Sequence, residues 1–275
     1  MAIRLDAGTM RRLALHEAMV HQVPGRDLRD LGDAVLLHDP VDPEPFWNRM
    51  AGVRWPEESD AFDRRLSEML VLFASLGRQP HIWPSPEHDT PEDLVARLTA
   101  NGFRDMGLST MMAIHGHAVS TLGERATPSG VTVERSTGLN ASAAASVAPA
   151  IVEVLRDAFD VGAEREAGIR DETIVSLGHP SFTHYVVRLE GRPAAVARRA
   201  TFDGLSYLSS IGTATWSRGR GLARLVTEIA LRDAVAARSE LIHLGVYADN
   251  HGAISLYRGL GFDRIGMAVP DLLLV

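Results

Sequence analysis

The chain has 275 residues, of which 45% are hydrophobic and 23% charged, and a formal net charge of −7. This length fits two domains of roughly 100–150 residues each, and the composition is that of a globular protein. The acidic balance argues against a nucleic-acid partner, and the absence of cysteine excludes disulfides, thiolate metal sites and a cysteine nucleophile. No stretch reaches the ~18 uninterrupted apolar residues of a membrane span, and the N-terminus lacks a signal-peptide core, so we expect a soluble, cytoplasmic protein with no membrane partner.

The first half of the chain predicts short strands and two amphipathic helices. The strands are expected at residues 34–37, 81–83 and 105–114, and the helices at 61–75 and 91–100. Thr90 is the expected N-cap of the second helix. Glycine and proline then gather between His115 and Val131, which places a domain boundary near residue 126 and predicts domains at 1–125 and 126–275.

The second half predicts an antiparallel meander followed by alternating helices and strands. Hairpin turns at Glu190-Gly191 and Asp203-Gly204 separate three strands. The expected strands are 131–134, 184–189, 194–201, 205–213, 241–247 and 263–269, and the expected helices are 140–159, 164–177, 222–236 and 252–260. Pro149 is expected to kink or divide the first of these helices.

A glycine-bearing turn links the third meander strand to the helix at 222–236. Its sequence, Ser-Arg-Gly-Arg-Gly-Leu-Ala, ends at Ala223. Glycines let the backbone approach a ligand closely, and the free amides of a first helical turn, together with the helix dipole, attract anions. Arg218, Arg220 and Arg224 add positive charge in a chain that is acidic overall. The turn therefore predicts a pyrophosphate site, although glycine patterns are also common in simple turns.

The downstream segment agrees with this interpretation. Asn250 follows the strand at 241–247, and the next helix carries Ala253 and Tyr257, with Gly261-Phe262 after it. Alone, Asn250 fits a helix cap and Tyr257 a core aromatic. Together with the glycine turn, these residues resemble the GNAT superfamily of N-acetyltransferases over about residues 131–275.

The resemblance implies an α/β fold with a mostly antiparallel sheet, a splayed parallel strand pair and flanking helices. It implies that acetyl-CoA is the cosubstrate, with no metal. Backbone groups of Ile211 and Thr213 would face the acetyl-pantetheine arm, Asn250 would bind the pantetheine, and Tyr257 would face the sulfur as the catalytic acid. The pyrophosphate would be held by the turn, at Arg218, Gly219, Arg220, Gly221, Leu222 and Ala223. Thr215 departs from the family, which often has proline there.

The implied reaction moves an acetyl group to a primary amine of a small molecule or peptide. The sequence leaves open whether the protein is a monomer or a homodimer. A lysine-like amine with a pKa of ~10.4 is neutral in fewer than about one molecule in a thousand at pH 7, so a base is needed. Tyr257 is the candidate acid for the leaving thiolate, and a backbone N–H of residues 211–213 is expected to meet the oxyanion. The sequence leaves the base open among Glu153, Asp157, His184 and Asp203.

Other functions fit the sequence less well. A dinucleotide site would need a third glycine and a βαβ opening, and neither is present at Gly219 to Arg224. His16 and His21 are five positions apart, so they do not share a helix face as zinc ligands, and we expect a solvated helix surface there. The alternative from another class is a coenzyme A or metabolite sensor without turnover.

The two halves share a pattern that predicts an internal repeat. Gly102-Phe103 and Gly107 match Gly261-Phe262 and Gly266, each 159 positions later. At the same spacing, Tyr257 corresponds to Leu98 and Asn250 to Pro91. We therefore expect tandem copies, the first a degenerate GNAT-like domain with no coenzyme site. Residues 39–45 of this half are acidic and proline-rich, a poor phosphate cradle.

Overall fold

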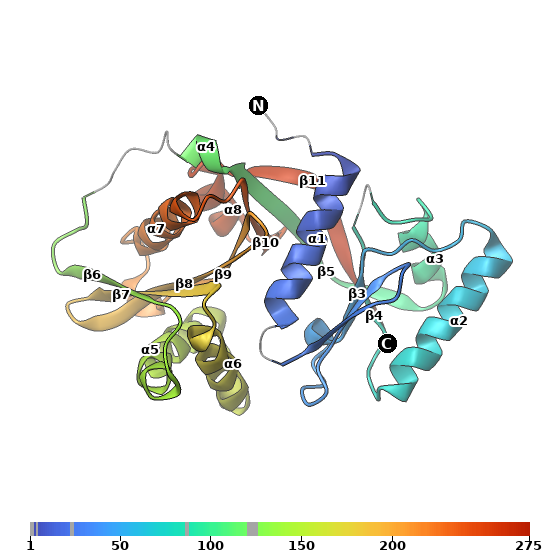
Figure 1. Ribbon diagram of the computed structural model, residues 1–275, viewed down its shortest axis with the longest axis horizontal. Coiled ribbons are helices and arrows are strands. Elements are labelled where there is room, and N and C mark those ends of the chain that lie inside the picture. Colours follow the sequence, from blue (N-terminus) through green and yellow to red (C-terminus); the bar gives the residue numbers. More distant parts are fainter. Residues whose placement is uncertain (1–2, 4, 23–24, 86–87, 120–125) are drawn as a thin grey trace. The chain divides into compact units, whose positions relative to one another are not determined.

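The computed structural model describes residues 3, 5–22, 25–85, 88–119 and 126–275 (Figure 1). The chain forms two compact units that do not coincide with its sequence halves. The first unit holds residues 1–112, 245–254 and 264–275, and the second holds 113–244 and 255–263. The predicted boundary near residue 126 stays a prediction, and residues 120–125 beside it lie outside the described part.

The first unit contains a mixed sheet with strand order β1-β2-β3-β4-β11-β5. β1, β2 and β3 form an antiparallel meander, and β4 is parallel to β3, with Met50 opposite Ile82 and Ala51 opposite Trp83. The C-terminal strand β11 pairs antiparallel with β4. The elements are α1 (Ala7–Gln22), β1 (Asp27–Asp30), β2 (Val35–His38), η1 (Pro45–Trp47), β3 (Arg49–Ala51), α2 (Ser59–Ser75), β4 (His81–Trp83), α3 (Leu94–Ala100), β5 (Phe103–His115) and β11 (Asp263–Leu274).

The core of this unit lies between the sheet and helices α2 and α3. Buried side chains with helical spacing on α2 pack against strand residues and an aromatic pair, Trp55 and Phe62, whose rings are 5.6 Å apart. Burying side chains of this size contributes roughly 1.5–3 kcal/mol each. The main members of the cluster are Leu36, Met50, Trp55, Phe62, Met69, Phe73, Leu98 and Phe103.

The prediction of a solvated helix surface at His16 and His21 is wrong. Both histidines and Glu17 are buried in α1. Glu17 accepts two hydrogen bonds from Nη2 of Arg49, each 2.8 Å long, and pairs with His21 at 2.8 Å. Burial alone would raise the pKa of Glu17, but the charges of Arg49 and His21 lower it to about 2. A buried strand arginine thus fixes the orientation of α1.

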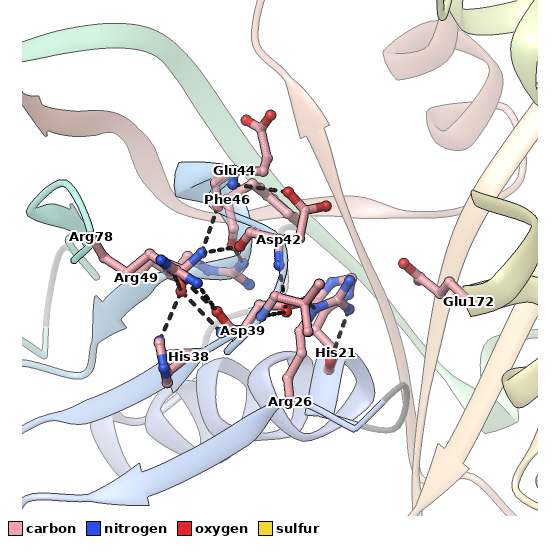
Figure 2. Close-up of polar contacts among 12 residues, drawn as sticks. His21, Arg26, His38, Asp39, Asp42, Glu44, Phe46, Arg49, Arg78 and Glu172 are labelled. Carbon is pink, nitrogen blue, oxygen red and sulfur yellow. Dashed lines mark hydrogen bonds and ion pairs between the residues drawn. The ribbon is translucent and has the colours of Figure 1, made fainter. Parts of the chain in front are cut away.

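A second polar group lies beside this pair (Figure 2). Asp39 accepts a 2.9 Å hydrogen bond from Nε of Arg26, and its carbonyl accepts one of 2.8 Å from Arg78. Arg49 stacks on the rings of Phe46 and Trp83, at 4.2 and 4.3 Å. Each charge has a partner or an aromatic face, so the cluster holds the 39–48 connection in place.

The second unit contains strands in the order β10-β9-β8-β7-β6. The four strands β6 to β9 form an antiparallel meander, and β10 runs parallel to β9. Figure 1 shows α5 and α6 on one face of this meander and α7 on the other. The elements are α4 (Gly116–Val119), β6 (Val131–Ser136), α5 (Ala141–Phe159), η2 (Ala163–Arg165), α6 (Glu166–Gly178), β7 (Phe182–Leu189), β8 (Arg192–Phe202), β9 (Leu205–Thr213), η3 (Thr215–Ser217), α7 (Leu222–Ala236) and β10 (Leu241–Tyr247). Helix α8 (His251–Arg258) begins in the first unit and ends in the second.

Local signals predicted most of these elements. Both hairpin turns have the two consecutive positive φ angles of a type I′ turn, 50° and 80° at Glu190-Gly191 and 47° and 73° at Asp203-Gly204. The side chain of Asn140 caps α5 by accepting the N–H of Ala143 at 3.0 Å. Strand β11 extends beyond the predicted 269 to Leu274, because its last residues pair with β4.

The expected start of α3 at residue 91 is wrong, and so is the expected division of α5 at Pro149, whereas a kink at Pro149 stays a prediction. Helix α3 begins at Leu94 rather than at 91, and the Thr90 hydroxyl donates to the Trp55 carbonyl at 3.2 Å instead of capping the helix. Helix α5 is not divided, since it runs through Pro149 as one element. Pro149 is exposed, so water can bond to the carbonyl that the proline leaves unpaired.

Candidate active site

The site predicted from the sequence centres on the end of β9. Among the described residues, the pairing of β10 with β9 ends at His243 and Tyr207, whereas β9 continues to Thr213. Ser210 lies just beyond this point and has a φ of +52°, which L side chains rarely adopt. The pairing of β9 with β8 shifts register at the same place, between Val196 and Arg198. A β-bulge therefore lies where β9 loses its parallel neighbour, and bulges often redirect groups at active sites.

The far end of β9 lies close to helix α5. A Cβ added at Gly212 would lie 3.0 Å from Cβ of Ala158, so a larger residue would push the strand away from the helix. Ile211 and Thr213, the predicted acetyl-arm residues, are half-buried on either side of this glycine. The Thr213 hydroxyl is buried, and no described residue forms a hydrogen bond with it. Such a group costs free energy unless a ligand or water satisfies it.

The turn after β9 adopts the conformation that an anion site needs. Gly219 and Gly221 have φ angles of +76° and +74°, and a Cβ added at either would enter open space. Gly221 is the N-cap of α7, and in the part of the chain that the structure describes no side chain caps this helix. The first amides of α7, at Leu222 and Ala223, therefore lack a side-chain acceptor. They are available to an anion at the positive end of the helix dipole.

The three arginines of the turn differ in their partners. Arg218 donates to the Ala158 carbonyl at 3.1 Å, and so ties the turn to α5. Arg224 pairs with Glu228 at 2.8 Å and donates to the Gly259 carbonyl at 2.9 Å. Arg220 is exposed, and its side chain forms no ion pair or hydrogen bond with any residue that the structure describes. Of the three, only Arg224 has an ion pair among the described residues, and Arg220 is the one whose side chain is not engaged by the protein there.

Tyr257 lies in the second unit and is buried beside Phe262, with ring centres 5.8 Å apart. Burial raises its pKa to about 12, so the phenol stays protonated at neutral pH. Asn250 lies in the first unit, and its side-chain oxygen accepts the N–H of Ala253 at 3.1 Å. This is the helix-capping role that the sequence also allowed. A part in coenzyme binding stays a prediction for Asn250.

The four candidate bases fit that task poorly. Asp157 accepts hydrogen bonds from the backbone N–H and hydroxyl of Thr215, and these lower its pKa. His184 is buried, and burial lowers its pKa to about 3, with the charge of Arg198 adding to the effect. Asp203 occupies a hairpin turn, and Glu153 is exposed on α5. Glu172 was not among the predicted site residues, and it pairs with the buried Arg198 of β8 at 2.9 Å. The sequence signal that could have indicated this pair is Arg198, an arginine inside the largely apolar strand β8.

The described residues were also compared with the requirements of a metal site and of a membrane-spanning helix. Among the described residues, no three His, Asp or Glu side chains cluster in a way that could hold a metal ion. No helix within the described ranges is both long and apolar enough to span a bilayer.

Residues 148–262 match the model of the acetyltransferase (GNAT) family. This segment is thus similar to the GNAT acetyltransferases. It contains β9, the bulge, the glycine turn and Tyr257. Mycothiol acetyltransferase of Kineococcus radiotolerans is 34% identical to the chain over 110 residues, which is 39% of this chain and 36% of that protein. The match thus spans about a third of the curated relative.

Solved structures show that the GNAT fold extends over the whole chain. A GCN5-related N-acetyltransferase from Kribbella flavida aligns over 99% of this chain and 96% of its own, with a TM-score of 0.69 and 22% identity. A tandem GNAT protein from the clavulanic acid biosynthesis pathway aligns over 93% of this chain and 86% of its own, with a TM-score of 0.64 and 15% identity. At these identities the likeness concerns the fold alone.

Proposed function

We propose that the protein transfers an acetyl group from acetyl-CoA to a primary amine of a small molecule or peptide. The observation that carries this proposal is the start of α7, where two left-handed glycines precede uncapped helical amides. The match of residues 148–262 to the acetyltransferase (GNAT) family model supports it.

The residues at the end of β9 and in the turn fit acetyl-CoA. The amides of residues 219–223 would bind the pyrophosphate, and Arg220 would add a charge from the exposed side. Thr213 offers a buried hydroxyl that lacks a partner among the described residues, and Ile211 follows the bulge with its backbone N–H. Arg218 would act indirectly, by holding the turn against α5.

The chemistry needs a proton donor and a proton acceptor. The amine nitrogen attacks the thioester carbonyl, the C–S bond breaks, the thiolate takes a proton, and the nitrogen gives up a proton to the proton acceptor. Tyr257 is the proposed donor, because its phenol is protonated at neutral pH and lies in the same unit as β9. A backbone N–H near Ile211 would stabilise the oxyanion.

We further infer that the first unit binds no coenzyme. Its counterpart of the β9–β10 pair is β3 and β4, and here the gap beyond the pair is closed. The N–H of Thr90 donates to the Val53 carbonyl at 3.0 Å, and the N–H of Trp55 donates to the Thr90 carbonyl at 2.9 Å. These two backbone hydrogen bonds bridge the segments that follow β3 and β4, where a pantetheine arm would have to pass.

The helix that corresponds to α7 is also occupied. The carboxylate of Glu58 accepts the N–H groups of Asp60 at 2.9 Å and Ala61 at 2.8 Å, so it fills the anion position at the start of α2. These two hydrogen bonds lower the pKa of Glu58. The counterpart of the glycine turn thus lies between β3 and α2, not in the proline-rich residues 39–45, which connect β2 to β3.

Isothermal titration of the full-length protein with acetyl-CoA tests the proposal. We expect one site per chain. No binding would contradict the proposed function, and two equivalent sites would contradict the inference about the first unit.

A further inference from the structure

The last turn of α5 holds the residue that leads into the glycine turn. The carboxylate of Asp157 accepts two hydrogen bonds from Thr215, one from its backbone N–H and one of 2.9 Å from its hydroxyl. Thr215 is the first residue of η3, the short helix that lies between β9 and the glycine turn. One carboxylate of α5 therefore fixes both the backbone and the side chain of this residue.

The other end of η3 is tied to the same turn of α5. Nη2 of Arg218 donates to the carbonyl of Ala158, the residue after Asp157, at 3.1 Å. The last carbonyls of a helix lack partners within the helix, and the negative end of its dipole attracts cations. Arg218 supplies both a donor and a positive charge at that point. The residues on either side of η3 are thus held by consecutive residues of one helix.

Strand β8 holds η3 from a second direction. The buried Ser217 hydroxyl donates to the Ala194 carbonyl at 2.9 Å, and the N–H of Ala214 donates to the same carbonyl at 2.8 Å. Gly219 and Gly221 have no side chains with which to pack. The path of the turn therefore depends on how the residues before and after it are held, and α5 and β8 hold the residues before it.

The helix itself does not account for an aspartate at position 157. Aspartate is a weak helix former, and a negative charge in the last turn of a helix opposes the helix dipole. The two hydrogen bonds from Thr215 lower the pKa of Asp157, and the charges of Arg218 and Arg192 add to this effect. The carboxylate is therefore ionised at neutral pH, and its stabilising partners lie outside α5.

Two effects of Asp157 on coenzyme binding have opposite signs. Its charge interacts with that of Arg218, at the start of the turn, so the carboxylate also lies near the proposed pyrophosphate site. Repulsion between the two negative charges would weaken binding. Holding the turn in place would strengthen binding, because a turn that is already ordered loses less conformational entropy when the ligand arrives. The sign of the change on removing Asp157 therefore distinguishes the two effects.

We propose that Asp157 is a positioning residue for coenzyme binding, a proposal that rests on the proposed function. Its bonds to Thr215 set the path of the chain into the glycine turn before the coenzyme binds, and Arg218 completes the attachment to α5. Without these bonds the free turn samples other conformations. Binding then has to restore the one conformation whose amides face the pyrophosphate, and the apparent affinity falls.

The test is isothermal titration of the full-length protein with acetyl-CoA, with thermal melting in parallel. The main variant is Asp157→Ala. Its matched control is Glu153→Ala, which removes the same charge from an exposed position one turn earlier on α5. Thr215→Val removes only the hydroxyl bond, whereas Thr215→Ser keeps it. The double variant of Asp157→Ala with Thr215→Val shows whether the two residues act through one contact.

For D157A we expect the Kd for acetyl-CoA to rise by about fivefold or more, since the low end of one net hydrogen bond corresponds to about twofold and two are lost. T215V should raise the Kd about twofold, and adding it to D157A should raise the Kd no further. T215S and E153A should bind as wild type does. With an amine acceptor, the KM for acetyl-CoA in D157A should rise with the Kd while kcat stays unchanged.

A folded D157A that binds acetyl-CoA as tightly as wild type overturns the proposal, and so does tighter binding, which loss of the charge alone would cause. Should D157A fail to fold, T215V decides, and a wild-type Kd in T215V overturns the proposal. Wild-type protein that does not bind acetyl-CoA overturns the proposed function, and this inference with it.

Discussion

Replacing Gly221 with valine tests whether the turn before α7 binds the pyrophosphate of acetyl-CoA. Gly221 has a φ of +74°, and a Cβ there would enter open space in front of the α7 amides. An L residue in this conformation costs roughly 1–2 kcal/mol, which for a chain of this size lowers Tm by roughly 2–8 °C. The same side chain would keep an anion away from the amides. Each hydrogen bond to a charged group contributes about 1.5–3 kcal/mol, so losing two weakens acetyl-CoA binding by at least ~10²-fold.

Gly191 provides a matched control, because it has a φ of +80° and equally open space but lies in the β7–β8 hairpin. Gly191→Val should lower Tm by a similar amount and leave the Kd for acetyl-CoA unchanged. Isothermal titration and thermal melting of both variants measure the two effects. Unchanged affinity in a folded Gly221→Val protein would refute the assignment of the turn to the pyrophosphate.

Three further predictions concern the acid, the first unit and the buried pair. Tyr257→Phe keeps the ring that packs on Phe262, so melting should be unchanged while kcat falls by ~10²-fold; an unaltered kcat would leave the tyrosine a purely structural role. Glu58→Ala should lower stability by about 1 kcal/mol through loss of a helix cap, and calorimetry should still give one coenzyme per chain; a second site would show that only this carboxylate blocks the first unit. Glu17→Gln leaves Arg49 buried without its partner and should cost about 3–5 kcal/mol in urea unfolding at pH 7. The folded pKa of Glu17 is about 2 and its ordinary value is 4.5, so wild type holds this stability above pH 4.5 and loses it as the pH falls towards 2. If the free energy of unfolding of the variant fell by the same amount between pH 4.5 and 2, the assignment would be disproved.

Local patterns determined what could be predicted from the sequence. Strand β9, the turn and helix α7 lie where hairpin glycines and helical spacing place them. The internal repeat stays a prediction, but its two glycines share a backbone conformation. Gly102 and Gly261 have φ angles of 91° and 89°, and each directly precedes a buried phenylalanine. These features depend only on neighbouring residues.

Features that join distant residues could not be predicted. Glu17 and Arg49 meet across the first unit, and a helix that carries histidine and glutamate has the composition of a solvated face. Glu172 likewise has the sequence context of a surface residue until Arg198 is placed opposite it. The closure at Thr90 depends on backbone hydrogen bonds between 53–55 and 90, which no residue type encodes.

We propose that the second unit transfers acetyl from coenzyme A to an amine. The most direct measurement incubates the full-length protein with acetyl-CoA and a panel of primary amines, and follows thiol release together with the mass of each amine. We expect thiol release that depends on the amine, with one amine gaining an acetyl group, and a ~10²-fold lower rate of both in Tyr257→Phe. A protein that binds acetyl-CoA and yet acetylates no amine would contradict acetyl transfer as its function and favour a coenzyme sensor.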